Sequence, residues 1–345
     1  MIKSRTIATA MKPYPLLFRP NLQETVWGGT RIKPLKGLAS DKQPIGESWD
    51  ISGIAGRESI VANGALAGRS LSDAISLLGA DLLGQKVFSN YRSTGFPMLV
   101  KIIDAARDLS IQVHPNEELA QARHHKHGKA EMWYVMHAEP GTTLLAGFSK
   151  EITPEEYERR VKNGTIVEVL ARHEAHTGDV FYIPAGRVHA LCGGITVCEI
   201  QQSSDITYRL FDYNRPDLTG HLRQLHTAEA KQALDYQVYP SCRTEYDMPD
   251  NGAVCVVECP YFVVNVISAA TSVRRSLKAE DCFVTLTCVE GSCTVSIADD
   301  EAGHDTAGTV ELATGDSCLI PAAIADYVVE SSGSSPARLL ESWAK

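Results

Sequence analysis

The sequence lacks several features that would place it in large classes of protein. No apolar stretch approaches the roughly 20 residues that a membrane-spanning helix needs. The basic stretch MIKSRTIATAMK at the start has no apolar core, so we expect no secretion signal. Neither a GxxxxGKS/T loop nor a GxGxxG turn is present, so nucleotide binding has no support. The nine cysteines include no CxxC pair, which favours a reduced, cytoplasmic protein that uses cysteine as core filler.

Positive charge is also scarce. The chain has 33 Lys and Arg against 42 Asp and Glu, a formal net charge of -9. We therefore expect no nucleic-acid partner and no membrane partner, whereas a local basic site for a small anion is compatible with this balance. The composition is otherwise that of an ordinary globular protein, with 44% hydrophobic residues. A length of 345 residues suggests two domains of about 150 residues each.

Short apolar or alternating segments separated by turns dominate the chain, which predicts an all-β fold with a few short helices. We predict helices at 70–84, 154–163, 165–173 and 227–236, the second with Thr153 as N-cap and Glu156 completing a capping box. Predicted strands lie at 96–103, 109–113, 131–136, 179–184, 195–202 and 207–213, and six more follow residue 245. The polar stretch 239–252 is the expected boundary between domains 12–245 and 246–345.

One internal repeat sharpens this prediction. The segment GDVFYIPAGRVHAL (178–191) is answered by GDSCLIPAAIADYVV (315–329), and both contain G-D-x-x-x-I-P-A. Two copies of one β-unit predict two jelly-roll domains. Asp326 or a neighbour replaces His189 in the second copy, so we expect the C-terminal domain to carry no metal site.

Polar residues suited to metal binding recur on single faces of the predicted strands. In LSIQVHP (109–115), alternation puts Leu109, Ile111 and Val113 on one face and Ser110, Gln112 and His114 on the other. Three polar groups on an inner face need a partner, such as a metal or a polar ligand, whereas a solvated outer face is the ordinary alternative.

Two further segments complete a candidate ligand set. In KAEMWYVM, Lys129 and Glu131 share a face with Trp133, and His189 follows a tight turn at the end of a strand. Gln112, His114, Glu131 and His189 together form a plausible set of metal ligands on three strands. The nearby histidines of HHKH, His124, His125 and His127, are better interpreted as part of a polar loop.

These motifs occur together in a known family. The matching segments span about residues 14–215, and they are YPLLFRPNLQETVWGG, IGESWDIS, FPMLVKIIDAARDLSIQVHPNEELA, GKAEMWYV, GDVFYIPAGRVHAL and EIQQSSDITYRLFDYNR. In these segments the chain resembles the compact bacterial form of the type I phosphomannose isomerases, which belong to the cupin superfamily. The resemblance implies one zinc ion bound by Gln112, His114, Glu131 and His189, and a catalytic arginine at Arg209. It fades after about residue 245 and says little of the C-terminal domain.

The resemblance also implies a substrate. It would be a phosphorylated hexose, with mannose 6-phosphate and fructose 6-phosphate interconverted by proton transfer through an enediol-like intermediate. The polar groups that match the substrate site of the family are Lys101, Ser110, Lys129 and, less closely, Glu199. The base that moves the proton stays open between Lys129, Glu199 and a metal-bound water. Trp27 and Trp49 can wall the sugar site or belong to the core.

Two other functions fit the same residues. Two histidines and one carboxylate resemble the ligands of an iron-dependent cupin dioxygenase. Gln112 as a fourth ligand, together with Arg209 and two lysines, favours a phosphosugar over oxygen chemistry. A sugar-binding cupin without catalytic activity is the third interpretation, and the two enzymes would differ from it in losing turnover on chelation.

Overall fold

The computed structural model describes residues 12–39, 41, 43–92, 94–298, 308–324 and 326–345. The expectation about a secretion signal concerns a stretch that lies almost wholly outside these residues. The chain forms two compact units. Unit 1 comprises the described residues up to Asn21, Trp49–Val100 and Glu245–Lys345, and unit 2 comprises Leu22–Ser48 and Lys101–Thr244.

This grouping differs from the predicted domains 12–245 and 246–345, because two N-terminal segments belong to unit 1. Leu16 pairs with Leu319 across an antiparallel ladder, and the Leu82 carbonyl accepts a hydrogen bond of 2.9 Å from the Ala322 amide. One boundary between the units, at Glu245, falls within the polar stretch 239–252.

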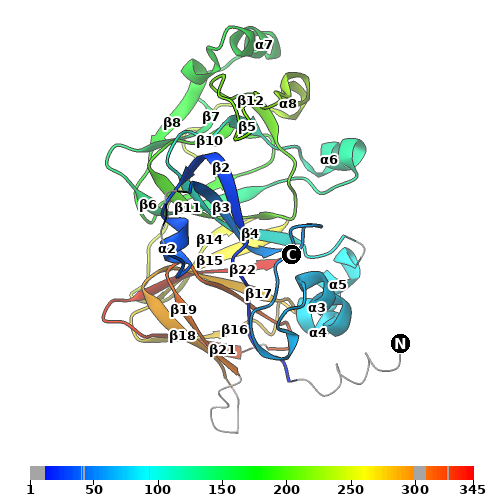
Figure 1. Cartoon of the computed structure of the whole chain (residues 1–345), viewed down its shortest axis with the longest axis vertical. Helices are drawn as coiled ribbons and strands as arrows, with labels where there is room; N and C mark the ends of the chain where they lie inside the picture. The colour runs from blue at the N-terminus through cyan, green and yellow to red at the C-terminus, as the bar shows by residue number, and fades with distance from the viewer. Residues whose placement is uncertain (1–11, 40, 42, 93, 299–307, 325) are drawn as a thin grey trace. The chain divides into compact units, whose positions relative to one another are not determined.

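Two antiparallel sheets form most of unit 2, and their strands run from blue through cyan to green in Figure 1. The first has the order β13-β9-β6-β11-β4-β2-β3, and the second has the order β12-β5-β10-β7-β8. Residues 49–52 and 98–100 of the first sheet belong to unit 1. Their bounds are β2 Leu22–Gly29, β3 Ile45–Ser52, β4 Met98–Ala105, β5 Ile111–Val113, β6 Glu131–Ala138, β7 Thr143–Phe148, β8 Leu170–Glu174, β9 Val180–Ile183, β10 His189–Leu191, β11 Ile195–Gln202, β12 Tyr208–Phe211 and β13 Arg243–Thr244.

Each face of the five-stranded sheet is covered by a different part of the core. One face packs on an apolar cluster that includes Ile111, Val113 and Leu145 together with Tyr157 of α7 and Ala230 of α8. The opposite face contributes other residues of the same strands to a second cluster, which contains Trp133 and Phe181 of the seven-stranded sheet. Side chains on this second face therefore point into the space between the two sheets of unit 2, where Gln112 also lies.

The helices of unit 2 are short and follow local signals. They are α2 Ile32–Leu35, α6 Glu117–His124, α7 Pro154–Lys162 and α8 Thr227–Ala233, with a 3₁₀ turn at Ile166–Val169. Helix α7 begins where predicted, because Thr153 Oγ1 accepts a 3.2 Å hydrogen bond from the Glu156 amide. Glu156 does not complete the capping box; its carboxylate instead accepts a 2.8 Å bond from Arg160 Nε, one turn along the helix.

Several predicted elements are corrected by the structure. The predicted helix 165–173 is a single 3₁₀ turn followed by β8, since the apolar residues Ile166 and Val169 are buried by that one turn. The helix that begins at Thr227 ends at Ala233, short of Tyr236. Strand β5 begins at Ile111, so Leu109 does not share a face with Ile111; it packs in the cluster between the two sheets.

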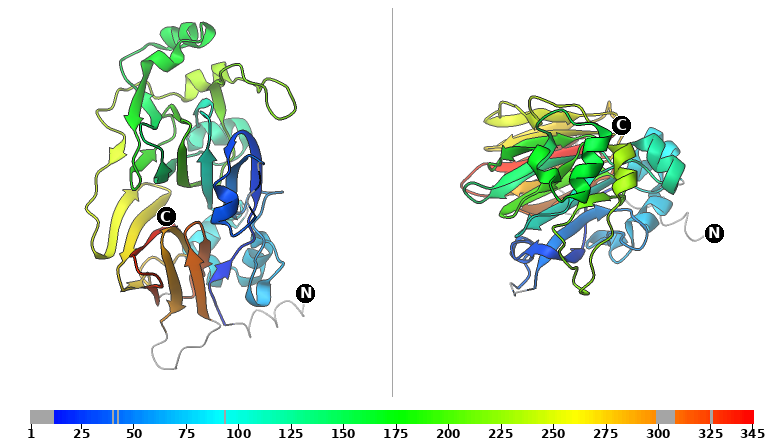
Figure 2. Two further views of the ribbon diagram at one scale, coloured as in Figure 1. Left: turned by 60° about the vertical axis from the view of Figure 1, so that its left-hand side comes forward. Right: turned by 90° about the horizontal axis from the view of Figure 1, so that it is seen from above.

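Unit 1 also consists of two antiparallel sheets, with the orders β1-β20-β17-β22-β15-β14 and β16-β21-β18-β19. Its strands are β1 Leu16–Leu17, β14 Asn251–Glu258, β15 Phe262–Ala269, β16 Ser272–Ser276, β17 Val284–Glu290, β18 Ser292–Ile297, β19 Thr309–Ala313, β20 Ser317–Ile320, β21 Asp326–Ser331 and β22 Ala337–Ala344. Figure 2 shows helices α3 Leu71–Leu78, α4 Ala80–Leu83 and α5 Gln85–Tyr91 grouped together, and a 3₁₀ turn at Gly64–Leu66 precedes them. The all-β prediction with few short helices is confirmed.

The predicted repeat is visible in the backbone of both units. Gly178 and Gly315 adopt φ of 93° and 97°, a conformation that favours glycine. Their amides donate equivalent bonds of 2.8 Å, to the carbonyls of Val135 and Cys288 respectively. Each is followed by a four-residue strand, β9 or β20, so the two copies have the same local structure. None of the helices formed by the described residues is long and apolar enough to cross a membrane.

Candidate functional site

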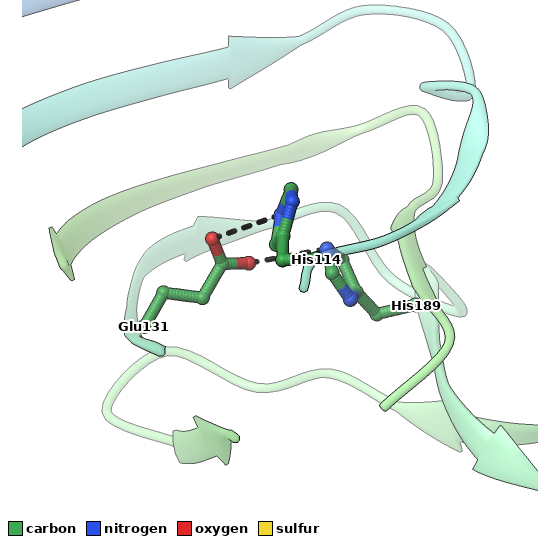
Figure 3. A group of neighbouring side chains, drawn as sticks. All are labelled: His114, Glu131 and His189. Carbon is green, nitrogen blue, oxygen red and sulfur yellow. Dashed lines mark ion pairs between the residues drawn. The ribbon is translucent and has the colours of Figure 1, made fainter. Parts of the chain in front are cut away.

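Three ligand-type side chains converge between the sheets of unit 2. Glu131 is the first residue of β6, His189 the first of β10, and His114 follows the end of β5. The two oxygens of Glu131 point to different rings, as Figure 3 shows: Oε2 lies 3.3 Å from His114 Nε2 and Oε1 lies 3.2 Å from His189 Nε2. All three residues are buried, and their ligand atoms lie within 4.8 Å of one another.

Backbone carbonyls orient both imidazoles toward Glu131. His114 Nδ1 lies 2.9 Å from the Ile206 carbonyl, and His189 Nδ1 lies 2.8 Å from the Arg187 carbonyl. A carbonyl oxygen can only accept, so each Nδ1 carries the proton and each Nε2 presents a lone pair. This outer arrangement is typical of histidines that bind a metal through Nε2.

The charge states support the same interpretation. Burial, together with the nearby Lys129 ammonium, lowers the pKa of His114 to about 3 despite the opposing Glu131 carboxylate. Burial also lowers the pKa of His189, against the effect of Glu131. Although burial opposes it, the Lys129 ammonium holds the pKa of Glu131 well below its usual range. Two neutral imidazoles and a carboxylate are the forms that bind a metal ion.

Neither oxygen of Glu131 has a geometrically suitable hydrogen-bond donor among the described residues, although Lys129 Nζ lies 2.8 Å from Oε2 and 3.1 Å from His114 Nε2. A second buried carboxylate, Glu341 of unit 1, offers the contrast. Glu341 accepts two bonds of 2.8 Å from Arg275, one of 2.6 Å from Asn265, and one from Tyr327. Buried polar atoms are normally satisfied as those of Glu341 are. Two carboxylate oxygens and two imidazole nitrogens that face one another are all atoms that bind metal ions, so this donor set fits a metal.

The fourth predicted ligand lies beside this group. Gln112 is the residue opposite His189 in the ladder of β5 and β10, and its amide nitrogen lies 3.2 Å from His189 Nε2. A half-turn of that amide would direct its oxygen at the same point. The structure thus brings together all four residues expected to bind metal, in the immediate neighbourhood of Glu131.

A polar cavity of about 130 Å³ adjoins the group. Its charged lining consists of the cations Lys101, Lys129, Arg209 and Arg223 and the carboxylates Glu47 and Glu199. Ser110 and Gln112 also line it, so every predicted substrate-site residue faces this space. Trp27 and Trp133 contribute aromatic walls, whereas Trp49 belongs to unit 1 and is not part of the lining.

Lys101 and Glu199 form the centre of a charge network in the cavity. Lys101 Nζ lies 3.2 Å from Glu199 Oε1 and 3.6 Å from Glu47 Oε2. Burial alone would lower the pKa of Lys101, but Glu47, Glu199 and Glu131 outweigh it and raise that pKa. Glu199 Oε2 accepts a 2.9 Å bond from Trp133 Nε1, and Lys129 Nζ lies 3.9 Å from Glu199 Oε1.

Arg209 differs from the other cations of the cavity. Its Nε donates to Ser110 Oγ at 3.2 Å, and its Nη1 donates to the Gln224 carbonyl at 3.0 Å. Lys101, Lys129 and Arg223 each pair with a carboxylate, whereas Arg209 makes no ion pair with a described residue. Burial and the neighbouring Arg223 lower the pKa of Arg209, yet a guanidinium stays charged. Arg209 is therefore the cation available to an anionic group in the cavity.

Two residues of the cavity lining, Arg223 and Glu47, are not among those predicted from the sequence. Arg223 binds the buried carboxylate of Asp212 through Nε at 2.7 Å and Nη2 at 2.6 Å, and Arg215 binds the same carboxylate at 3.0 Å. Arg223 follows a loop with no strand or helix pattern, so no local signal marked it. Glu47 could have been found, because it lies in IGESWDIS, one of the matching segments.

The histidine-rich loop has a structural role. His124 Nε2 lies 2.8 Å from the Tyr208 hydroxyl, and His127 Nδ1 lies 2.9 Å from Glu117 Oε1. His125 ends α6 in a left-handed conformation with φ of 53°. The described residues contain no metal-type cluster that includes these histidines.

Comparison with known proteins identifies the family. The model of the type I phosphomannose isomerase catalytic domain matches residues 16–143. Mannose-6-phosphate isomerase ManA of Bacillus subtilis is 34% identical over 284 residues, which cover 81% of this chain and 87% of that protein. Mannose-6-phosphate isomerase of Streptococcus mutans is 32% identical over 82% of this chain and 88% of its own length.

The solved structures agree with this result. The crystal structure of the mannose 6-phosphate isomerase from Bacillus subtilis superposes with a TM-score of 0.80 at 27% identity, covering 95% of this chain and 99% of that one. A putative mannosephosphate isomerase from Archaeoglobus fulgidus shares the fold, with a TM-score of 0.76 over 97% of this chain. The chain belongs to the type I phosphomannose isomerases, a family of aldose–ketose isomerases with the cupin fold.

Proposed function

We propose that this protein is a zinc-dependent mannose-6-phosphate isomerase, which interconverts D-mannose 6-phosphate and D-fructose 6-phosphate. One observation carries the proposal. The ligand atoms of His114, Glu131 and His189 converge beside a cavity whose lining includes both ion-paired side chains and Arg209, which has no carboxylate partner among the described residues. The name of the Bacillus subtilis relative supplies the substrate.

Zinc would be held by His114, Glu131, His189 and Gln112, whose nitrogen and oxygen donors suit it. When bound, it supplies a Lewis acid that polarises the substrate oxygens without redox chemistry. The prediction of a single zinc ion, and that of a cytoplasmic protein without nucleic-acid or membrane partner, stand as part of this proposal. Eight of the nine cysteines are buried, which is compatible with cysteine as core filler in a reducing compartment.

The chain's own residues bind and orient the sugar phosphate. Arg209 offers a guanidinium without a carboxylate partner, which can stabilise an oxyanion that develops on the substrate. Ser110 holds Arg209 Nε and so directs the guanidinium into the cavity. Lys101 lies between Glu47 and Glu199 and holds the Glu199 carboxylate in place.

Isomerisation moves one proton between C1 and C2, and two side chains of the cavity can carry it. Lys129 and Glu199 lie 3.9 Å apart and both face the space where the sugar would bind. Lys129→Met and Glu199→Gln separate the two roles. The residue that carries the proton should lose both turnover and exchange of the substrate C2 hydrogen with solvent, whereas loss of the other should slow turnover less.

Turnover of mannose 6-phosphate by the purified protein tests the function. We expect activity that is lost on chelation and restored by Zn²⁺, and that is lost in His189→Ala but kept in His125→Ala. Protein that binds mannose 6-phosphate without converting it would be a sugar-binding cupin. Protein that needs Fe²⁺ and consumes dioxygen would be a cupin dioxygenase.

A further inference from the structure

Strand β12, which carries Arg209, is the edge strand of its five-stranded sheet. On its inner side it pairs with β5, where Arg209 stands opposite Gln112. On its outer side, β12 has no neighbouring strand among the described residues. An edge strand leaves alternate amide and carbonyl groups without a ladder partner. At Arg209 these groups are met by a residue outside the sheet.

That residue is His226. The Arg209 amide donates a 3.2 Å bond to His226 Nδ1, and the His226 amide donates a 2.8 Å bond to the Arg209 carbonyl. His226 thus bonds both main-chain groups of Arg209, as a neighbouring strand would. Because both groups point away from β5, Arg209 and Gln112 form a non-hydrogen-bonded pair, the kind in which facing side chains lie closer together.

The same segment also holds the guanidinium. Two residues before His226, the Gln224 carbonyl accepts the 3.0 Å bond from Arg209 Nη1. Arg209 is therefore fixed at its main chain by His226 and at its side chain by Gln224 and by Ser110 at 3.2 Å. Segment 224–226 acts as one clamp on this residue.

His226 is placed for this role by its own surroundings. It precedes α8 as the N-cap residue, yet its side chain makes no capping bond to the helix. Burial, the Arg209 guanidinium and His124 lower the pKa of His226, with Glu229 opposing them. Its Nδ1 can accept a bond only while unprotonated, so the lowered pKa keeps the Arg209 contact intact near neutral pH. Tyr208, which precedes Arg209 on β12, has its ring centroid 6.2 Å from that of His226.

We infer that His226 is a positioning residue for Arg209, holding the edge strand so that the guanidinium faces the cavity beside Gln112. The inference rests on the proposed function, since Arg209 is taken to act on the substrate. It assigns His226 no contact with substrate or metal. Its effect on turnover should pass through Arg209 alone.

A double-mutant cycle tests this dependence. His226→Leu should change the same kinetic parameter that Arg209→Ala changes, by a smaller factor of about 10 to 100, as expected when a catalytic group is misplaced. In the Arg209→Ala background the same substitution should have little further effect, because neighbours that act as a unit are not additive. Equal effects in both backgrounds would overturn the inference. So would wild-type kinetics in His226→Leu.

Two conservative variants keep the test decisive if His226→Leu fails to fold. His226→Asn places a carbonyl oxygen close to the position of Nδ1 and should stay within a few-fold of wild type. His226→Gln extends its oxygen toward the position of Nε2 and should resemble His226→Leu. Equal activity of the Asn and Gln variants would contradict the proposed bond. His221→Leu is the matched control, since His221 lies in the same loop and its hydrogen bonds to described residues are with Thr219 and Asp217.

A measurement without substrate separates this inference from the proposed function. The Arg209 Nε–H resonance, assigned by its loss in Arg209→Lys, should shift in His226→Leu but not in His221→Leu. If wild-type protein does not convert mannose 6-phosphate, the proposed function fails while this shift still tests the clamp. If wild type is active and the resonance does not move, the clamp alone is wrong.

Discussion

Arg209 stands directly opposite Gln112 in the antiparallel pair of β12 and β5. Facing residues of such a pair project from the same side of the sheet. The predicted catalytic arginine is thereby tied to a predicted metal ligand, and Gln112 in turn stands opposite His189. Arg209, Gln112 and His189 therefore lie in one row across the neighbouring strands β12, β5 and β10.

Removing a histidine ligand should remove the metal. We expect His114→Ala and His189→Ala to lose most of their zinc by elemental analysis, because each leaves Glu131 with a single imidazole. Zinc at 100 times its dissociation constant should stabilise wild-type protein by about 2.7 kcal/mol in denaturant titrations, and these variants by far less. His125→Ala is the control; loss of its zinc would place the site in the histidine-rich loop.

The thiols of the C-terminal repeat should bind no second metal. We expect one zinc per chain, unchanged in the triple variant Cys282→Ser, Cys288→Ser, Cys318→Ser. The position that corresponds to His189 is Asp326, whose carboxylate pairs with Lys278 at 2.7 Å. A stoichiometry near two that drops in the triple variant would refute this prediction.

Replacing Arg209 should separate catalysis from binding. If Arg209 stabilises charge that develops during proton transfer, Arg209→Ala should lower kcat by about 10²- to 10³-fold with a smaller rise in KM. Arg209→Lys should also be poor, since a point charge cannot replace the planar guanidinium. Zinc content should not change. A near-normal kcat with a large rise in KM would make Arg209 the phosphate anchor instead.

Breaking the buried pair of Lys101 and Glu199 should destabilise the fold as well as the site. Lys101→Met leaves the Glu199 carboxylate, 3.2 Å away in the native protein, without that partner, and such a loss costs roughly 3–5 kcal/mol. Adding Glu199→Gln should recover part of this free energy of unfolding. Lys126→Met, which breaks the exposed pair with Asp205, should cost no more than about 1 kcal/mol. A double variant as unstable as the single one would contradict the prediction. Lys101→Ala should in addition raise KM if Lys101 helps to bind the phosphate.

The lowered pKa of His226 predicts a specific pH dependence of the stability of the protein. Its folded-state pKa is lowered by burial, Arg209 and His124, against Glu229, below the ordinary value of about 6.5. Between these two pKa values the unfolded chain binds more protons than the folded one, so the free energy of unfolding rises with pH. The contribution of His226 to stability is therefore lost as the pH falls below about 6.5. In chelator-treated protein, the stability of wild type relative to His226→Asn should therefore decrease from about pH 7 toward pH 5. A difference that does not change with pH would refute the lowered pKa.

The sequence by itself was sufficient to predict the candidate metal ligands and several local structures. Strand alternation and turn motifs are local patterns, so Gln112, His114, Glu131 and His189 could be recognised as candidate ligands without the fold. The helix at Thr153 and the paired turns at Gly178 and Gly315 were also local, because a cap or a left-handed glycine depends on adjacent residues.

Only the tertiary structure decided which distant residues complete the site. Arg223 reaches the cavity from a loop, and its position carries no local signal. Glu47 lies in one of the matching segments, but strand pairing is what places it at the cavity. Leu109 changed face because the strand starts two residues later than its alternation suggested. The pairing of Leu16 with Leu319 joins residues from opposite ends of the chain. Such contacts depend on how buried surfaces match after folding, and no window of sequence contains both partners.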